Sequence, residues 1–433
     1  MASALENYVN HVRNFSSSDN FRELAEYLNE SLELLTKNYN ILDNVLETLD
    51  IQQHSLGVLY VLLAKLVNIV KSNADSGNIV KSVKDFINLC NGEQIRYAAQ
   101  TYFELCHVFT SYMVTQPNVI QAIKILSTAI EKVRLHETQL TSVHADLCLV
   151  SLKAKCFNTV LRFLDVDITA IATTDDVHVD SKYFLLYYYY GGMIYTAIKN
   201  YDRALYFFEV AISTPAMVMS CIMLEAYKKF ILVSLILHGK VINIPKYSHI
   251  SRFMKPLSQA YYELGNAYAT SSSDEVRNVI NKYRDLYSRD INLGLVKQVA
   301  QSLYKKNIQR LTKTFLTLSL ADVASRVQLS SAVEAEKYIL NMIKSGEIFA
   351  SINQKDGMVI FKDDPEKYCS PEMFLKIQED MSRVMELNKQ INKMEEDIML
   401  NPMFVKKSIG NQDEDIMISG QHSKSSYSGD PTD

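Results

Sequence analysis

A pattern of small and large residues that returns along the chain constrains the fold more than any other feature of the sequence. Its clearest copy lies in residues 187–212, which read YYYYGGMIYTAIKNYDRALYFFEVAI. Small and aromatic residues follow one another there at Gly192, Tyr195, Ala204, Phe208 and Ala211. Small residues let two neighbouring helices approach closely, and large residues fill the space between them. The segment therefore predicts a helix pair of the tetratricopeptide-like kind, with a polar turn at KNYD.

Further copies of the second helix of this pair precede it. Ala122, Leu126 and Ala129 have the spacing of Ala204, Phe208 and Ala211, and Val160 and Leu164 fit the same pattern. A weaker copy follows at MLEAYKKFILVSLIL and HGKVINIPKY. A repeat of about 40 residues without strand-rich segments predicts an α-solenoid, in which each helix pair buries its apolar face against its neighbours.

The tyrosine run at 187–190 has three possible roles. Successive helical residues are about 100° apart, so four tyrosines in a row point around most of the helix. They could pack inside stacked helices, present one or two rings to a partner, or stack on nucleic acid bases. The repeat pattern favours the interior.

Composition restricts the kinds of partner. The net charge is -4 and the sequence pI is about 6.2, so binding to nucleic acid or to an acidic membrane would need a local basic patch. Six cysteines without a C-x-x-C pair indicate buried thiols in a reducing compartment. The first residues lack the apolar core of a signal peptide, and no apolar run is long enough for a membrane span. We expect a protein of the cytoplasm and nucleus.

The pattern changes after about residue 310. The segment 312–361 predicts three helices with apolar positions at Phe315, Leu316 and Leu318, then Val323, Ala324 and Val327, then Ala335, Tyr338, Ile339 and Ile343. Ser330, with Ser331 and Glu334 after it, is suited to cap the third helix. EIFASIN and GMVIF then alternate as two strands around QKDG. Three helices and a two-stranded ribbon predict a winged helix at about 310–362.

A winged helix raises the question of DNA binding. Its third helix sets Glu334 and Glu336 against Lys337 and Lys344, which is a neutral surface and not the basic one that groove readers use. The basic YKKNIQR at 304–310 lies on a preceding helix and is typical of a solvated or protein-facing surface. Nucleic-acid binding is disfavoured but stays an alternative.

Catalytic motifs are absent from the sequence. No two of the nine histidines are two residues apart, and Leu140 in HETQL stands where a helical zinc motif needs its second histidine. There is no G-x-S-x-G, P-loop or G-x-G-x-x-G. His144 and Cys148 are four residues apart, a pair that we interpret as structural. We predict no catalytic, cofactor-binding or metal-binding residues.

The C-terminal segment 371–400 has a heptad pattern. Ile377, Val384, Ile391 and Ile398 repeat every seven residues, and Met373, Leu387 and Met394 occupy the interleaved position, where Asp380 is the exception. Such a stripe either folds back on its own winged helix or binds other chains. The residues after Pro402 are rich in Ser, Gly, Asp and Lys and predict a disordered tail with serines open to phosphorylation.

A helical solenoid that runs directly into a winged helix resembles the PCI-domain proteins of the proteasome lid, the COP-9 signalosome and translation initiation factor three. Long stretches are most similar to the third-subunit family of the signalosome, among them CNGEQIRYA at 90–98, YYYYGGMIYTAIKNYDRALYFFEVAISTPAM at 187–217 and EAEKYILNMIKSGEIFASINQKDGMV at 334–359. Subunits of the proteasome lid or of the initiation factor stay as alternatives, because their solenoids and winged helices follow the same pattern.

The resemblance implies a non-catalytic scaffold subunit of the complex that removes the ubiquitin-like modifier Nedd-8 from cullins and so regulates cullin-RING ubiquitin ligases. Another chain would then carry the catalytic metalloprotease, and the neighbours would be the first and eighth subunits. It implies contacts through the winged-helix ribbon and a bundle of C-terminal helices, with the interface at Ile348, Phe349, Ile352, Ile377, Val384, Leu387, Ile391, Met394 and Ile398. We expect no membrane, nucleic-acid or small-molecule partner.

The expected fold class is mainly α, an α-solenoid followed by a winged-helix (PCI) domain and a C-terminal helix. The expected division is helical repeats at 1–195, a PCI domain at 196–365, an assembly helix at 371–400 and a tail at 401–433.

Overall fold

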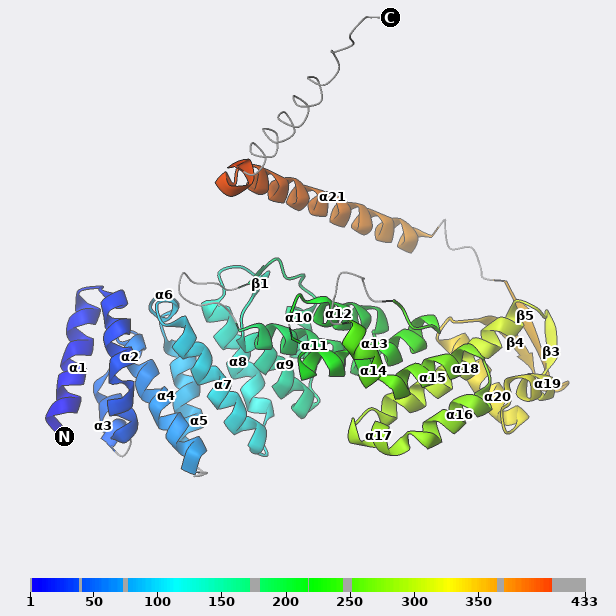
Figure 1. Cartoon of the computed structure of the whole chain (residues 1–433), viewed down its shortest axis with the longest axis horizontal. Coiled ribbons are helices and arrows are strands. Elements are labelled where there is room, and N and C mark those ends of the chain that lie inside the picture. Colours follow the sequence, from blue (N-terminus) through cyan, green and yellow to red (C-terminus); the bar gives the residue numbers. More distant parts are fainter. Residues whose placement is uncertain are drawn as a thin grey trace, which may run out of the picture.

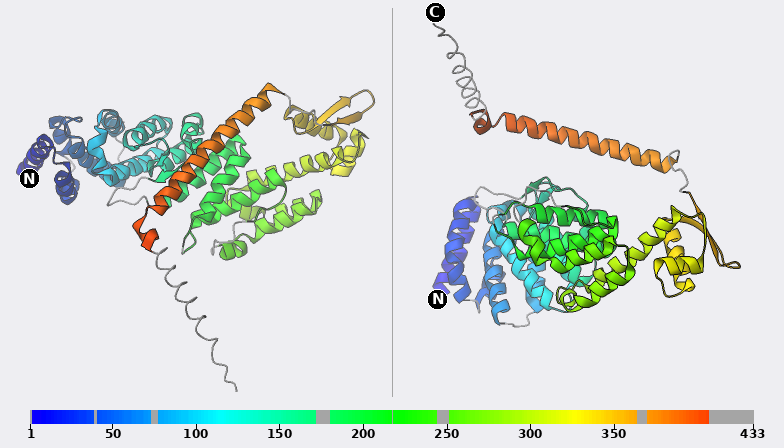
Figure 2. Two further views of the ribbon diagram at one scale, coloured as in Figure 1. Left: turned by 90° about the horizontal axis from the view of Figure 1, so that it is seen from above. Right: turned by 45° about the vertical axis from the view of Figure 1, so that its right-hand side comes forward.

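The computed structural model describes residues 2–38, 41–72, 77–171, 180–216, 218–243, 251–363 and 370–406. They form an elongated row of helices with a small sheet at the end away from the N-terminus, and one long helix lies alongside the row (Figure 1). Seen from above, the row keeps this extended shape (Figure 2, left). The mainly α prediction is confirmed.

The first part of the row consists of stacked helices. In chain order they are α1 (Ala2–Ser17), α2 (Phe21–Lys37), α3 (Leu42–Thr48), α4 (Ser55–Ser72), α5 (Gly77–Leu89), α6 (Gly92–Arg96), α7 (Ala99–Thr115), α8 (Ile120–Val133), α9 (Val143–Ala154), α10 (Asn158–Leu164), α11 (Ser181–Ile198), α12 (Tyr201–Ser213) and α13 (Cys221–His238). Two short strands, β1 (Gln139–Leu140) and β2 (Ala170–Ile171), pair in parallel beside them.

The helix pair α11 and α12 packs as the sequence pattern predicted. Gly191 and Gly192 allow the close approach, because a Cβ on either would lie 2.6 Å from the ring of Phe207 or Phe208. At the turn, Lys199 adopts the left-handed conformation with φ 69°, and the side chain of Asn200 caps α12. The sequence therefore specifies both the contact and the turn of this pair.

The tyrosine run lies mainly inside the solenoid. Tyr187 and Tyr188 are buried, and their rings meet Phe207 at centroid distances of 5.9 and 5.2 Å. Tyr189 and Tyr190 are half-buried and pack against the same core. The prediction of interior packing is confirmed.

The other repeat positions are buried in the same way. Ala122, Leu126 and Ala129 in α8, Val160 and Leu164 in α10, and Ala204, Phe208 and Ala211 in α12 are all fully buried. Of the weaker fourth copy, α13 is present, whereas residues 244–250 lie outside the described residues.

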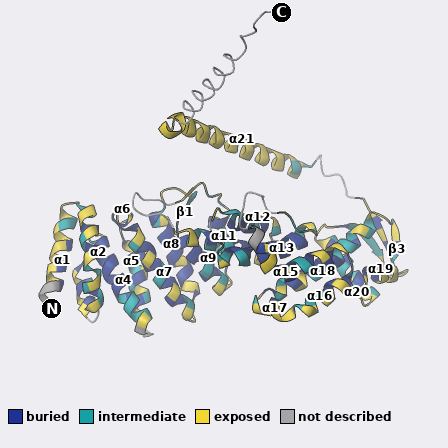
Figure 3. Ribbon diagram, viewed as in Figure 1, coloured by how far each residue is buried: buried dark blue, intermediate teal, exposed yellow. Residues whose placement is uncertain are grey.

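The second half of the row continues the stack toward the sheet. Its helices are α14 (Ser251–Leu257), α15 (Gln259–Ala269), α16 (Ser273–Lys282), α17 (Arg284–Arg289) and α18 (Leu293–Thr312). One core runs without interruption from Leu5 in α1 to Leu303 in α18. The burial colouring shows this continuous interior and the exposed outer faces (Figure 3).

A winged helix ends the row. It consists of β3 (Thr317–Ser319), α19 (Leu320–Val327), α20 (Ala332–Lys344), β4 (Phe349–Asn353) and β5 (Met358–Lys362). The strands form a sheet in the order β3-β5-β4, and Gly357 turns the β4–β5 hairpin with φ 61°. A second core, from Tyr304 to Phe361, lies between this sheet and the helices.

Two local predictions were wrong. The expected first helix at Phe315, Leu316 and Leu318 is absent: Leu318 lies in strand β3, Phe315 and Leu316 precede that strand, and α18 supplies the first helix of the winged helix instead. The ribbon therefore has three strands and not two. The cap of α20 is Ser331, whose hydroxyl accepts a hydrogen bond from Glu334 N–H, while Ser330 donates to the Glu334 carboxylate at 2.6 Å. The apolar spacing of so short a strand does not distinguish it from a helix.

None of the helices within the described ranges combines the length and the apolar character needed to cross a lipid bilayer.

Candidate assembly interface

The C-terminal helix α21 (Pro371–Met399) is 29 residues long and begins with strong local signals. The Ser370 hydroxyl accepts a hydrogen bond from Met373 N–H, and Pro371 occupies the first helical position, where its missing N–H costs nothing. No residue of α21 is buried. Isolated helices are marginally stable in water, and most helices in proteins gain their stability by packing an apolar face.

The predicted stripe lies on the outside of this helix. Its members are between 48 and 65% exposed: Ile377, Val384, Leu387, Ile391, Met394 and Ile398. In the burial view, nearly the whole helix is coloured as exposed (Figure 3). The structure therefore places the six residues on one helix without a cover from the described part of this chain.

The apolar surface is wider than the predicted stripe. Phe374, Leu375, Met381 and Met385 are each more than 60% exposed, and residues 402–406 add a helical turn with exposed Met403. Met381 follows Asp380, so an apolar side chain lies next to the position where the heptad pattern is broken. Strict seven-residue counting missed Phe374, Met381 and Met385, although a helical period of 3.6 places them beside the stripe, with Leu375 on the opposite face. Residues 407–433 of the predicted tail lie outside the described residues.

α21 touches the solenoid through an ion pair. Arg383 Nη2 lies 2.9 Å from Asp167 Oδ2, and Asp167 also pairs with Arg203 at 3.2 Å. The three side chains are exposed or partly exposed. In both views of Figure 2, α21 lies alongside the middle of the row and not against the winged helix.

The three predicted ribbon residues differ in their surroundings. Ile348 is buried in the second core, and Ile352 is half-buried against it. Phe349 is also half-buried. The side chain of Ile348 therefore belongs to the interior of the winged helix, and any contact at this position would use the backbone.

Strand β4 lies at an edge of the three-stranded sheet. Ser351 pairs with Ile360 of β5, and Phe361 N–H donates to Leu316 on the other side of β5 at 2.8 Å. Because backbone groups alternate in direction along a strand, Ser351 bonds toward β5, whereas Ala350 and Ile352 direct their N–H and C=O groups toward the open edge. Such an edge can accept a strand from another chain.

The outer face of α20 does not offer base-reading groups in the usual pattern. Val333 is 74% exposed and Leu340 is 42% exposed, while Glu336 accepts a hydrogen bond from Gln354 at 2.7 Å. Lys305 of the basic segment pairs with Glu347 at 2.7 Å. This surface is mixed and partly apolar, which suits contact with protein better than with DNA.

His144 and Cys148 have the surroundings of packed residues. Thr141 donates to His144 Nδ1 from its N–H at 3.1 Å, and the His144 ring meets Phe163 and Tyr187 edge-on. Burial lowers the pKa of His144 to about 4 and raises the pKa of the Cys148 thiol. A buried, protonated thiol is a poor nucleophile.

A second histidine pair was not predicted. His107 in α7 contacts the Asp146 carboxylate in α9, and its ring stacks on Tyr183 in α11 at a centroid distance of 3.9 Å. Burial raises the pKa of Asp146, and the contact with His107 opposes this shift. The pair ties three helices together. Its members are 39 positions apart, so no local sequence motif marks it.

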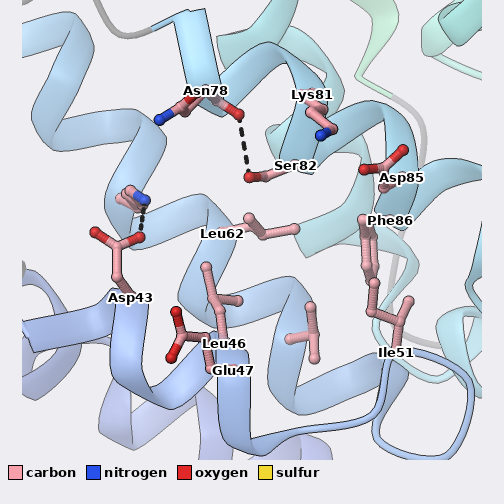
Figure 4. A pocket seen from close by; sticks show the side chains of 12 residues that line it. Asp43, Leu46, Glu47, Ile51, Leu62, Asn78, Lys81, Ser82, Asp85 and Phe86 are labelled. Atoms are coloured by element: carbon pink, nitrogen blue, oxygen red, sulfur yellow. Dashed lines mark hydrogen bonds and ion pairs between the residues drawn. The ribbon is translucent and has the colours of Figure 1, made fainter.

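A groove of about 620 Å³ lies between α3, α4 and α5 (Figure 4). Leu46, Leu62 and Phe86 form its apolar part, and Asp43 contacts Lys65 at its border. The lining contains no cysteine or histidine that could act as nucleophile or base. Within the ranges that the structure describes, no group of three or more His, Cys, Asp or Glu side chains could hold a metal ion.

Comparisons with known proteins cover nearly the whole chain. The family model described as COP9 signalosome complex subunit 3, N-terminal helical repeats, matches residues 18–250, and the PCI domain model matches 280–363. COP9 signalosome complex subunit 3 of Drosophila melanogaster is 62% identical over 448 aligned residues, which cover all of both chains. The protein of the same name from Arabidopsis thaliana is 35% identical over 406 residues, or 93% of each chain.

Proposed function

The chain belongs to the COP9 signalosome subunit 3 family, and from this premise we propose that it is a scaffold that holds other signalosome subunits together. It is a subunit of a non-catalytic type, with a PCI domain. Deneddylation of cullins, and with it the regulation of cullin-RING ligases, then belongs to the whole complex. Another chain of that complex supplies the metalloprotease.

The exposed stripe of α21 is the observation that carries this proposal. Fully burying an aliphatic or methionine side chain contributes roughly 1.5–3 kcal/mol, so six of them represent about 9–18 kcal/mol before ordering terms are subtracted. Exposed apolar surfaces of this kind mark the sites at which proteins bind other chains. Because it repeats every seven residues through several turns, its best partner is one or more other helices.

The open edge of β4 supplies a second contact in the proposal. It would extend the sheet with backbone hydrogen bonds from a neighbouring PCI subunit, and the half-buried Ile352 and Phe349 border it. We propose the first and eighth signalosome subunits as these neighbours. The two surfaces lie on different parts of the chain, so one subunit can connect several others.

We also propose the division into helical repeats at 1–195, a PCI domain at 196–365 and an assembly helix at 371–400, with residence in cytoplasm and nucleus. The first core continues across residue 195, so this boundary separates sets of repeats and not two independent cores. The solenoid and its last repeats then fold as one unit.

Reconstitution with the other signalosome subunits tests the proposal. Replacing Val384, Leu387 and Ile391 with Glu should prevent entry into the complex, because three charges would be buried in the helix contact. A matched control replaces Ser382 and Lys393, on the opposite face of α21, with Glu and changes the net charge by the same three units. The control should assemble normally. Equal assembly of both variants, measured by co-purification, would remove the basis of the proposal.

A further inference from the structure

The helical repeats and the winged helix meet at a joint that is bridged by hydrogen bonds. The first core ends at Leu303 and the second begins at Tyr304, so the two cores divide within α18. The turn between α15 and α16 lies across this joint. Ser273 N–H donates to the Gln328 side chain at 3.0 Å, and the Ser273 hydroxyl donates to the Val327 carbonyl at 3.4 Å. Because Val327 and Gln328 end α19, the turn fixes the winged helix against the repeats.

Ser271 in this turn is bound by two side chains of α18. Arg310 Nη1 donates to the Ser271 hydroxyl oxygen at 2.7 Å, and Asn307 Nδ2 donates to the Ser271 carbonyl oxygen at 3.1 Å. The Ser271 backbone is left-handed, with φ 61°, a conformation common just after a helix end. Ser271 is half-buried and Arg310 is exposed. The serine oxygen therefore lies against a guanidinium at the surface of the protein.

The Arg310 side chain can bind an anion in addition to the serine. A guanidinium has five N–H donors, and Arg310 uses one of them on Ser271. No carboxylate of the described residues forms an ion pair with Arg310, and α18 itself contains no Asp or Glu. By contrast, Arg277 on the adjoining α16 pairs with Asp274 at 3.6 Å. The counter-ion of Arg310 thus does not come from the part of the chain that the structure describes.

A second serine of the winged helix has the opposite surroundings. Ser330, just before α20, donates to the Glu334 carboxylate at 2.6 Å. A phosphate on this oxygen would face a negative charge, whereas a phosphate on Ser271 would face a positive one. Phosphates opposite arginine gain charge-assisted hydrogen bonds, and phosphates next to carboxylates are repelled. Of these two serines, Ser271 alone is prepared to hold a phosphate.

We propose that Ser271 is phosphorylated, and that its phosphate binds Arg310 and stabilises the joint between the repeats and the winged helix. A protein kinase transfers the terminal phosphoryl group of ATP: the bond from the Ser271 oxygen to phosphorus forms, the bond from that phosphorus to the ADP oxygen breaks, and the hydroxyl proton goes to a base of the kinase. Asp274 and Glu275 follow the serine and are exposed, so the kinase is one with a basic substrate site. The inference goes beyond the scaffold proposal and does not rest on the role of α21.

Two charges near the serine oppose this pairing, but more weakly. Asp274 is engaged with Arg277, and Glu275 accepts a hydrogen bond from Thr270 at 2.7 Å. Both carboxylates are exposed to water, which screens them, while the Arg310 contact is direct. A kinase binds an extended chain, so the turn opens briefly for the transfer, as surface turns do. After the turn closes, the phosphate meets Arg310 and the turn opens less often.

Ser271→phosphoserine, installed in the full-length chain, tests the contact with Arg310. An exposed phosphoserine has a second pKa of about 6, and a cation in direct contact lowers this pKa. We expect phosphorus NMR to give a lower pKa at position 271, and Arg310→Gln to restore it to about 6. Ser330→phosphoserine is the matched control and should titrate above about 6, because Glu334 disfavours the second charge. Equal pKa values at the two positions, or no response to Arg310→Gln, are the results that exclude the proposed contact.

The modification itself is tested with Mg-ATP and a recombinant kinase that selects acidic residues after its target serine. Mass spectrometry should place one phosphate on Ser271, which Ser271→Ala abolishes and Ser272→Ala does not. Amide exchange of Ser273 should slow about tenfold or more in the phosphorylated chain, because its N–H bonds to Gln328 across the joint. No phosphate on Ser271, or an unchanged exchange rate at Ser273, would overturn the inference.

Discussion

Arg383 in α21 and Asp167 beside the solenoid form an ion pair of 2.9 Å, although 216 positions separate them in the chain. Both side chains are more than half exposed, and exposed pairs contribute only about 0–1 kcal/mol. The apolar stripe of α21 gains no cover from this contact. The ion pair is therefore a weak contact. It would hold α21 near the solenoid and leave the apolar surface of α21 open to partners.

Breaking the ion pair between Arg383 and Asp167 should have little effect on the stability of the fold. Arg383→Ala is expected to change the free energy of unfolding by less than about 0.5 kcal/mol, because the charges stay solvated. Asp167→Ala should cost more, since Arg203 then also loses its ion-pair partner and keeps only its bonds to the Leu164 and Asp165 carbonyls. A double-mutant cycle by chemical denaturation at low and high salt measures the coupling. A coupling above about 2 kcal/mol would mean that α21 belongs to the fold of this chain.

Proline at the open edge of β4 should impair assembly without unfolding the winged helix. Ile352→Pro removes an N–H that points away from β5, whereas Ser351→Pro removes one that bonds to it. We expect Ile352→Pro to stay folded and to lose binding to a neighbouring PCI subunit, and Ser351→Pro to unfold locally. Ile352→Ala controls for the lost side chain. Normal co-purification of folded Ile352→Pro would argue against strand pairing at this edge.

The sequence predicted the contacts that depend on local spacing. The small residues Gly192, Ala204 and Ala211 specify one helix pair, and their spacing alone indicates which faces meet. Strand β3 was missed because three residues are too few for a period to be recognised. The hydroxyl of Tyr261, which joins Asp290 and Asn292, was missed for another reason: it depends on how three helices stack, and side-chain contacts between distant segments leave no local pattern.

The buried His144 should make stability depend on pH. Its pKa is about 4 in the folded chain and 6.5 when exposed, so the unfolded chain binds more protons between these values. Stability should therefore be complete above pH 6.5 and fall as the pH drops toward 4, by roughly 3 kcal/mol in all. His144→Asn keeps an acceptor for Thr141 N–H but does not titrate. As the pH falls, the difference in unfolding free energy between the unsubstituted chain and His144→Asn should narrow. A difference that stays constant would contradict a lowered pKa of His144.

Tyr261→Phe should destabilise the second half of the solenoid. It leaves the buried Asn292 amide and the Asp290 carboxylate without a shared hydroxyl, and an unsatisfied buried group costs about 1–3 kcal/mol. Urea denaturation followed by circular dichroism measures the change. Tyr206→Phe, at a ring that is 47% exposed, is the control and should be neutral. Equal stability of both variants would show that water replaces the Tyr261 hydroxyl without lowering the free energy of unfolding.

Removing α21 should leave a folded chain that does not assemble. A chain that ends at Asp363 keeps both cores, because the first ends at Leu303 and the second at Phe361, and no residue of the removed helix α21 is buried. Its melting temperature should stay close to that of the full chain, since the lost contact is the weak ion pair between Arg383 and Asp167. It should also be more soluble, because the exposed apolar surface of α21 is gone. Thermal unfolding and co-purification with the other subunits separate the two effects. If the shortened chain melted many degrees lower while the full chain was a stable monomer, the stripe of Val384, Leu387 and Ile391 would pack on its own solenoid in solution, and the assembly role would pass to another surface.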